Sequence, residues 1–211
     1  MQPISHLLDA PQLLALAAAL GWASGIRLYA AVFLVGLAGY FGFVDLPSGL
    51  KILQHPGVLG AAGFMCFVEF FADKIPYVDT IWDTIHTVIR IPAGAALAAG
   101  ALGADSQAMG WIAALLGGSL AATSHAAKLT TRAAVNTSPE PFSNIGVSLF
   151  EDGLVVFMLW LSATHPVLFA IALVLSLVVA VVLMVVLVKF LRAVAIRIRD
   201  FFEGRRPVQG N

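Results

Sequence analysis

The stretch that decides the fold is VLFAIALVLSLVVAVVLMVVLVKF, residues 167–190, which is dominated by valine, leucine and alanine. A helix needs roughly 20 mainly apolar residues to cross a bilayer, so this stretch predicts a transmembrane helix that faces lipid. The whole chain agrees, because its 211 residues are 60% hydrophobic and only 11% charged, with a mean hydropathy of +0.92. A soluble domain carries about 25% charged residues. The composition therefore predicts an integral membrane protein without a separate soluble domain.

Five further apolar blocks precede this stretch. They cover about 11–44, 57–72, 78–102, 109–135 and 145–163. The first block is too long for one straight span at ~1.5 Å per residue, and Ser24 and Gly25 near its middle predict a broken or re-entrant helix. We therefore predict an all-α, polytopic membrane helix bundle of about six transmembrane helices. Residues 1–190 form one transmembrane domain, and residues 191–211 form a basic cytoplasmic tail that can continue as a helix.

Basic residues predict how the chain is oriented. Six of the twelve Lys and Arg residues lie between Lys189 and Arg206, and the positive-inside rule assigns such a cluster to the cytoplasm. Six spans then put the N-terminus there too, so we expect a multi-pass protein of the bacterial inner membrane with both termini cytoplasmic. The first residues, MQPISHLLDA, lack the basic region of a cleaved secretory signal. The formal net charge of +0 gives no sign of nucleic-acid binding.

Ionisable and polar residues interrupt the apolar blocks on particular helix faces. Block 78–102 carries a stripe spaced four, three and four residues apart, and block 109–135 carries one spaced three, four and four. Charged groups inside a membrane are costly and usually face a protein interior or a water-filled cavity. We interpret the set as a solute- or ion-binding polar cavity open to the cytoplasm, with structural ion pairs between helices as the alternative. The candidate residues are Arg27, Glu69, Asp73, Asp79, Asp83, His86, Arg90, His125, Lys128, Arg132, Asn136, Glu151 and Asp152.

The two stripes are expected to face each other. A short loop joins their blocks, so the two helices should form an antiparallel pair. Residues at equal distances from the turn then lie at the same depth, which puts Asp83 between Lys128 and Arg132. Asp79 comes within one helical turn of Arg132 in the same way. We therefore predict direct or water-bridged contacts from these two acids to these two bases.

Arg90 and the overall charge balance bear on the ligand. Arg90 lies beyond the paired zone and is expected to bind Glu69, Glu151 or an anionic solute. The acids associated with the inner blocks are Glu69, Asp73, Asp79, Asp83, Glu140, Glu151 and Asp152. The bases are Arg27, Lys74, Arg90, Lys128 and Arg132. Seven acids against five bases favour protons or cations as the ligands.

Signals for metals and for enzymes are weaker. Carboxylates and histidine one or two helical turns apart can reach one ion, so Glu69, Asp83 and His86 are candidate ligands of a divalent metal such as Mg, Mn, Fe or Zn. No other cofactor is indicated. The sequence holds no His-Glu-x-x-His pair, no Gly-x-Ser-x-Gly elbow and no Walker loop.

Three motifs resemble a known family. They are VEFFADKIP (68–76), DTIWDTIHTVIRIPAG (79–94) and NTSPEPFSN (136–144). Together they resemble the uncharacterised bacterial and plastid membrane proteins of the domain-of-unknown-function 4126 family, over about 16–162. The resemblance implies a multi-span membrane protein and no established activity. Glu69, Asp73 and Lys74 are also similar to the Glu-Leu-Gly-Asp-Lys motif of cation/proton exchangers, but the acids are four apart here, not three, and the glycine is missing.

Three classes of function fit these patterns. The first is a transporter or channel for a small solute or ion, coupled to cations or protons. The second is a membrane enzyme acting on a lipid or phosphate headgroup, in which Arg90, Lys128 and Arg132 hold the phosphate and Asp83 or His86 acts as base. The third is a non-catalytic scaffold or assembly factor whose charges are structural. The expected partners are the lipid bilayer and a small solute or ion, and a homo-oligomer is compatible with the sequence.

Overall fold

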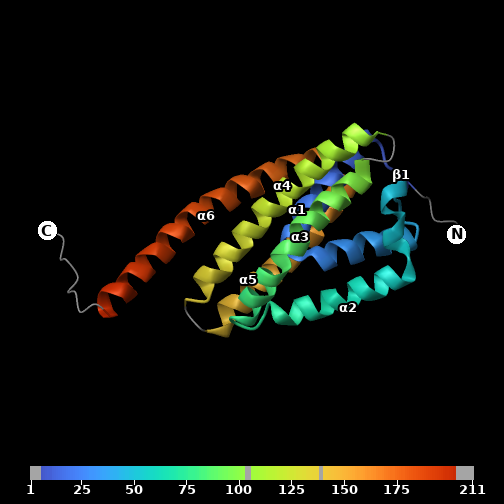
Figure 1. Cartoon of the computed structure of the whole chain (residues 1–211). Coiled ribbons are helices and arrows are strands. Elements are labelled where there is room, and N and C mark those ends of the chain that lie inside the picture. Colours follow the sequence, from blue (N-terminus) through green and yellow to red (C-terminus); the bar gives the residue numbers. More distant parts are fainter. Residues whose placement is uncertain (1–5, 103–105, 138–139, 203–211) are drawn as a thin grey trace.

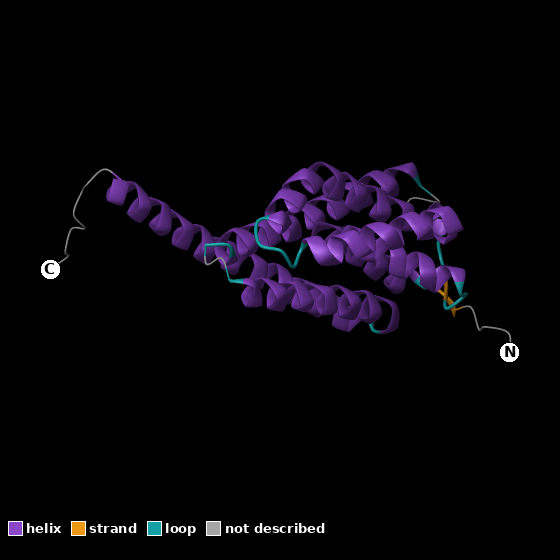
Figure 2. Ribbon diagram, turned by 90° about the horizontal axis from the view of Figure 1, so that it is seen from below, coloured by secondary structure: helices purple, strands orange, loops and turns teal. Residues whose placement is uncertain are grey.

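The protein is a bundle of helices, as the sequence predicts (Figures 1 and 2). The computed structural model describes residues 6–102, 106–137 and 140–202. The helices are α1 (Ala10–Tyr40), a 3-10 helix η1 (Ser48–Gln54), α2 (Pro56–Ala72), α3 (Val78–Leu102), α4 (Gln107–Val135), α5 (Pro141–Thr164) and α6 (Pro166–Phe202). Two short strands, β1 (His6–Leu7) and β2 (Val44–Asp45), pair in parallel. Each of the six predicted blocks is therefore a helix.

Helix α1 enters the bundle and folds back on itself. Its backbone leaves helical geometry at Arg27, where φ is −142° and ψ is 72°. Because His6 pairs with Val44, the two ends of α1 lie next to each other. Figure 1 shows one arm running into the bundle and the other returning to the same end. The predicted break is therefore present, two residues beyond Gly25, and α1 folds back at it.

Fewer than the predicted six of the described helices are long and apolar enough to cross a membrane. Four helices are long and apolar enough to cross a membrane, namely α1, α3, α5 and α6, and η1 with α2, bent by 69°, can count as a fifth. Helix α4 is not among them, but it runs antiparallel to α3 along the bundle. Because α1 folds back, α2 to α6 are the helices that run from one end to the other (Figure 1). Consequently β1 and the end of α6 lie at opposite ends of the bundle.

Glycines let α1, α3 and α4 approach closely at the centre of the bundle. A Cβ atom on Gly21 of α1 would lie 2.7 Å from the Cα atom of Gly117 in α4. A Cβ atom on Gly94 of α3 would lie 2.7 Å from the Cβ atom of Ala121. Small residues of this kind allow membrane helices to pack backbone against backbone. They fix the position of the α1 break against α3 and α4.

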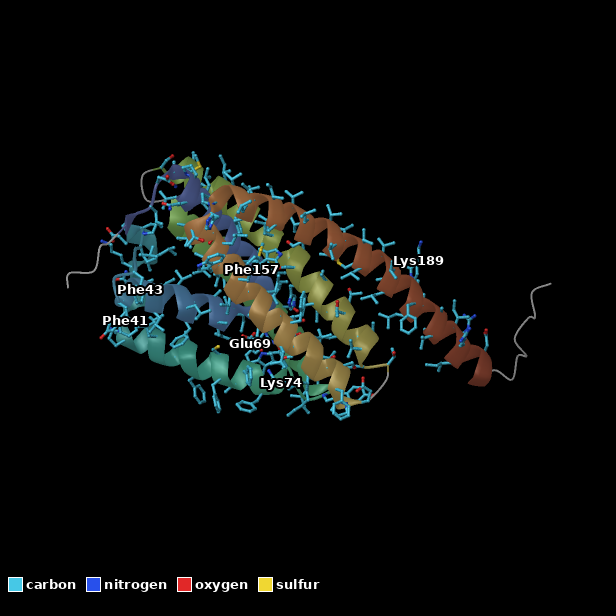
Figure 3. All side chains as sticks on the ribbon, turned by 180° about the vertical axis from the view of Figure 1, so that it is seen from behind. Phe41, Phe43, Glu69, Lys74, Phe157 and Lys189 are labelled. Carbon is cyan, nitrogen blue, oxygen red and sulfur yellow. The ribbon has the colours of Figure 1, made fainter. Side chains whose placement is uncertain are left out.

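Helix α6 lies along the bundle and extends far past it (Figures 1 and 3). It has 37 residues, and no residue in its most apolar stretch is buried. This agrees with the prediction that residues 167–190 face lipid, except near the start of the helix, where Phe169 is 1% exposed and belongs to the core. The helix continues through Lys189, labelled in Figure 3, to Phe202 without a break. The beginning of the segment assigned to the basic tail is therefore helical.

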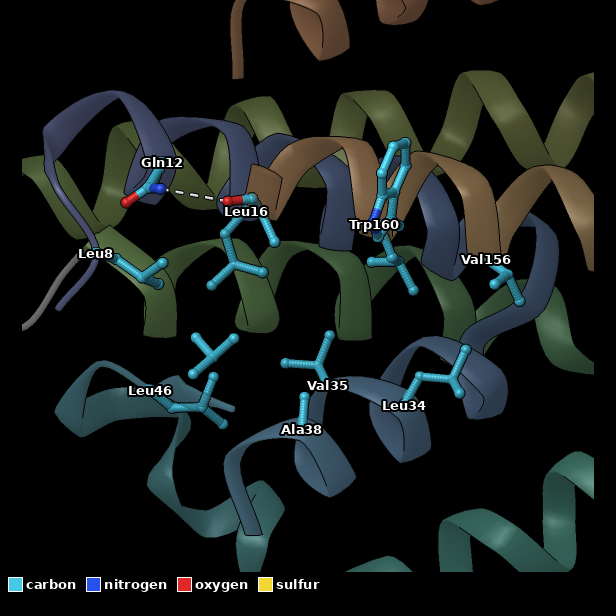
Figure 4. Close-up of a pocket in the computed structure, with 12 residues that line it drawn as sticks. Leu8, Gln12, Leu16, Leu34, Val35, Ala38, Leu46, Val156 and Trp160 are labelled. Atoms are coloured by element: carbon cyan, nitrogen blue, oxygen red, sulfur yellow. Dashed lines mark hydrogen bonds between the residues drawn. The ribbon is translucent and has the colours of Figure 1, made fainter. Parts of the chain in front are cut away.

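A cavity of about 250 Å³ separates the two arms of α1 (Figure 4). Leu16 comes from the first arm and Val35 from the second, and Trp160 of α5 closes one side. Its lining is apolar apart from Gln12, whose side-chain amide donates a hydrogen bond of 3.2 Å to the carbonyl oxygen of Ala163. No charged residue lines this cavity.

Candidate functional site: a buried network of ion pairs

The two polar stripes meet between α3 and α4. The Nζ atom of Lys128 lies 3.1 Å from the Oδ1 atom of Asp83. The Nη1 atom of Arg132 lies 3.8 Å from the Oδ2 atom of Asp79, and Asn136 donates a hydrogen bond of 2.9 Å to the same carboxyl group. These contacts confirm the pairing that the hairpin geometry predicts.

Arg90 joins this pairing from the same face of α3. Its guanidinium contacts the Oε1 atom of Glu69 at 2.5 Å and the Oδ1 atom of Asp83 at 2.9 Å. The contact with Glu69 is one of the two acid partners predicted for Arg90. Both residues of that pair are almost fully buried, with side chains 0% and 1% exposed. Arg90 therefore connects α3 to α2.

Asp73 anchors the C-terminal end of α2. Its carboxyl group accepts a hydrogen bond of 2.7 Å from Lys128 and a close one from Arg27 at the α1 break. Its backbone carbonyl accepts a hydrogen bond of 3.0 Å from Arg132. The C-cap residue of α2 thus binds cations from α1 and α4.

Helix α5 contributes a third face of polar residues. Glu151 lies 2.7 Å from Arg132, 3.5 Å from Arg27 and 3.8 Å from Lys128. The Ser148 hydroxyl accepts a hydrogen bond of 2.9 Å from Arg27. The backbone carbonyl of Asn144 accepts one of 3.2 Å from Arg132. These two further residues are absent from the sequence-based set, although Asn144, Ser148 and Glu151 are spaced four and three apart and so share one helix face.

The network reaches the surface at one point. Asp152 contacts the Nε atom of Arg27 at 2.9 Å and the Nζ atom of Lys74 at 3.4 Å. The side chains of Lys74 and Asp152 are 16% and 28% exposed, whereas that of Arg27 is 1% exposed. Burial lowers the pKa of the Lys74 ammonium group, which lies in the connection after α2. Figure 3 labels Glu69 and Lys74 along α2, where that helix joins the bundle.

The break in α1 ends inside this network. Its freed carbonyl groups accept hydrogen bonds from cations and a histidine: Gly25 from Arg90 at 3.4 Å and from His125 at 3.1 Å, and Ile26 from Lys128 at 3.1 Å. A helix end carries partial charge because its last carbonyls or first amides have no partner in the helix. The first arm of α1 therefore presents its negative end to cations at membrane depth.

The network holds one more acid than it holds bases. Its acids are Glu69, Asp73, Asp79, Asp83, Glu151 and Asp152, and its bases are Arg27, Lys74, Arg90, Lys128 and Arg132. Six acids against five bases leave a surplus of one. The larger surplus expected from the sequence included Glu140, which instead caps the N-terminus of α5.

His86 does not take part in the network, and this corrects the predicted metal site. Its Nδ1 atom hydrogen-bonds the carbonyl oxygen of Trp82 at 2.7 Å, and its ring stacks on that indole. Glu69 and Asp83 both bind Arg90 instead of converging with His86. Among the residues that the structure describes, no three His, Cys, Asp or Glu side chains group to hold a metal ion. The guanidinium of Arg90 lies between Glu69 and Asp83, in the place that the metal ion would take.

The charged groups of the predicted site contact one another directly in this structure. Asp73, Asp83 and Arg132 have side chains that are 0% exposed, and each touches an oppositely charged group. The sequence-based candidates are thus withdrawn from lipid. The candidates other than His86 and His125 form one connected cluster, and His125 binds the α1 break beside it.

Comparison with known proteins bears on the family alone. A family model described as a domain of unknown function (DUF4126) matches residues 14–186. The chain belongs to this family. The DUF4126 match includes every member of the ion-pair network and both arms of α1 beyond the first residues. No curated protein and no solved structure matches the chain.

Proposed function

We propose that this DUF4126 protein is a transporter that couples the movement of protons to a small solute or cation across the bacterial inner membrane. One observation carries the proposal. The break of a re-entrant helix lies inside a buried ion-pair network that has one more carboxylate than it has cations.

An uncompensated charge inside a membrane protein is costly. Asp73, Asp79 and Asp83 are all fully buried, so the surplus negative charge cannot be dispersed into water. A bound proton or small cation would neutralise it. Leaving out the partly exposed pair of Lys74 and Asp152 still leaves five acids and four bases. A proton-linked or cation-linked function accounts for this imbalance directly.

The α1 break supports transport through its geometry. Transporters commonly build their sites from discontinuous helices whose ends coordinate the solute near the middle of the bilayer. Here Gly25 and Ile26 end one arm among the cations of α3 and α4. Non-helical backbone at this depth survives only where it lines protein or water.

We further propose that the network opens toward the cytoplasm. Lys74 lies at the same end of the bundle as the basic end of α6, and basic residues favour the cytoplasmic side (Figure 3). The N-terminal β1 then lies on the opposite side of the membrane, because α1 folds back. This replaces the expectation of two cytoplasmic termini with one cytoplasmic C-terminus.

The alternative functions differ in how they use the cations. An enzyme acting on a phosphate headgroup needs free basic groups, but Arg90, Lys128 and Arg132 each bind a carboxylate and a backbone carbonyl. A scaffold is favoured by one observation, which is that these charges pair directly. Proton flux separates a scaffold from a transporter.

The test is proton flux in liposomes. The purified full chain is reconstituted with a pH-sensitive dye inside, and a pH gradient is imposed with and without a gradient of Na⁺ or K⁺. We expect the wild type to dissipate the pH gradient faster than empty liposomes, and Glu151→Gln to lose most of this flux. Asp200→Asn, which lies outside the network at the end of α6, is the control and should retain it. If the flux equals that of empty liposomes under every gradient, the transporter proposal is contradicted and the protein is a scaffold.

A further inference from the structure

The six carboxylates of the network have different numbers of cations close to them. Glu151 has three cations within 4.0 Å, while Asp73, Asp83 and Asp152 have two each. Among the residues that the structure describes, Glu69 has one such cation, Arg90, which is shared with Asp83, and Asp79 has one, Arg132 at 3.8 Å. Glu69 and Asp79 therefore have the fewest nearby cations.

The carboxyl group of Glu69 accepts one hydrogen bond; that of Asp83 accepts none among the described residues, but it has two cations, at 2.9 and 3.1 Å. The Glu69 side chain is 1% exposed, and Arg90 donates its hydrogen bond of 2.5 Å to Oε1. Its Oε2 atom is buried and has no hydrogen-bond partner among the residues that the structure describes. Asp79 also has a single cation, at 3.8 Å, but its Oδ1 atom accepts hydrogen bonds from Asn136 and from the Thr80 backbone. A proton on Oε2 of Glu69 would displace no existing hydrogen bond.

The groups that act electrostatically on Glu69 come from all the elements packed around it. They are Arg27 and Tyr29 of α1, Cys66 and Asp73 of the α2 segment, Arg90 of α3 and Lys128 of α4. Arg90 contacts Glu69 directly, and the Lys128 ammonium already contacts Asp73 and Asp83. Tyr29 and Cys66 are neutral at neutral pH. Arg90 is therefore the cation that Glu69 depends on.

We propose that Glu69 holds the exchangeable proton of this network, so that its ligand is H⁺ and not a metal ion. The proposal rests on the proposed function, because it names the coupling ion of the same site. The proton sits on Oε2, and Oε1 continues to accept the hydrogen bond from Arg90. With Glu69 neutral, the network has five carboxylates against five cations. Release of the proton to water leaves a carboxylate paired with Arg90, and the charge surplus returns.

Infrared spectroscopy of the purified protein tests this assignment without any transport. A protonated carboxylic acid has a C=O stretching band that a carboxylate lacks, and this band shifts on exchange into D₂O. In an ester-free detergent at neutral pH, the wild type should show one such band. Glu69→Gln should remove it. Asp79→Asn and Glu151→Gln, matched carboxyl-to-amide variants in the same network, should retain it.

Several outcomes would overturn the assignment. They are absence of the band in the folded wild type, its persistence in Glu69→Gln, and its loss in Asp79→Asn. If Glu69→Gln does not fold, Glu69→Asp keeps a carboxyl group that is one methylene shorter and should shift the band. An unchanged band in Glu69→Asp would also overturn it. A protein that shows the band but moves no protons in liposomes contradicts the proposed function and leaves Glu69 as the proton site.

Discussion

At the scale of single residues, Arg27 shows how one side chain links several elements. It lies at the α1 break and contacts Asp73 after α2 and both Glu151 and Asp152 on α5. A charge this deeply buried is stable only when it is paired and its remaining hydrogen bonds are made. Ser148 supplies one of those bonds. The fold-back of α1 and the ion pairs of Arg27 therefore form together.

Asp83 should be among the acids most sensitive to removal. It is fully buried and contacts both Arg90 and Lys128. Removing one partner of a buried ion pair costs about 3–5 kcal/mol, because the other charge is left stranded. Asp83→Ala should lower the free energy of unfolding by this amount, and adding Lys128→Ala should recover part of the loss. The measurement is denaturant unfolding in detergent micelles.

A control for this cycle lies at the far end of α6. Asp200 pairs with Arg199 at 3.7 Å, and the Arg199 side chain is 61% exposed. Exposed pairs contribute about 0–1 kcal/mol, so Asp200→Ala should change the free energy of unfolding little. If the double variant of Asp83 and Lys128 is no more stable than the sum of the single variants implies, the two residues do not act as a pair.

At the scale of elements, the break in α1 depends on a close approach to α4. A Cβ atom on Gly25 would lie 2.3 Å from the carbonyl oxygen of Ala121 and 2.8 Å from the backbone nitrogen of His125. Backbone atoms cannot move aside as a flexible side chain can. The two helices can therefore meet at this point only with glycine at position 25.

Gly25→Ala should destabilise the protein strongly. Overpacking costs typically about 1–3 kcal/mol and occasionally more, and contact with backbone should bring this variant to the upper end. Gly60 in α2 is a matched control, because a Cβ atom there meets nothing within 4 Å. Gly60→Ala should be neutral or raise the free energy of unfolding by about 0.5–1 kcal/mol, since it removes backbone freedom from the unfolded chain. Equal thermal unfolding midpoints for the two variants would show that Gly25 has no special role.

The start of α5 gives a prediction on pH. Glu140 is the N-cap, and hydrogen bonds from the side chain and then the backbone of Ser143 hold the pKa of its carboxyl below its usual range. A carboxyl group with a lowered folded-state pKa stabilises the fold above its unfolded pKa, and this contribution is lost as pH falls through the folded pKa. The melting temperature of the wild type should therefore exceed that of Glu140→Gln at neutral pH. The difference should vanish in acid, and a difference independent of pH would contradict the capping role.

Much of the pairing at this scale could be predicted from spacing. The positions of Asp79 and Asp83 relative to Lys128 and Arg132 follow from two helices and a short turn, and the contacts are present. The role of His86 could not be predicted, because spacing gives a residue's face and not the rotation of the helix against its neighbours. The stacking of His86 on Trp82 is decided by that rotation.

At the scale of the whole molecule, the direction of the chain after Arg27 decides the topology. Glycine, serine and arginine in the middle of an apolar block predict a break, but they contain no information on the angle between the arms. That angle is set by contacts far away in the sequence, such as the pairing of β1 with β2. A count of apolar blocks therefore gives six spans, whereas four of the described helices are long and apolar enough to cross a membrane, or five if η1 and α2 form one span.

The re-entrant path of α1 is the central claim, since it delivers the break to the ion-pair network, and side-specific labelling tests it most directly. In a Cys66→Ser background, single cysteines at the exposed positions Ala10, Phe43, Thr137 and Arg197 are treated with a membrane-impermeant thiol reagent in intact cells and after permeabilisation. We expect Ala10→Cys and Phe43→Cys to react in intact cells, and Thr137→Cys and Arg197→Cys to react only after permeabilisation. Reaction of Ala10→Cys and Phe43→Cys from opposite sides would show that α1 crosses the membrane and would contradict this structure.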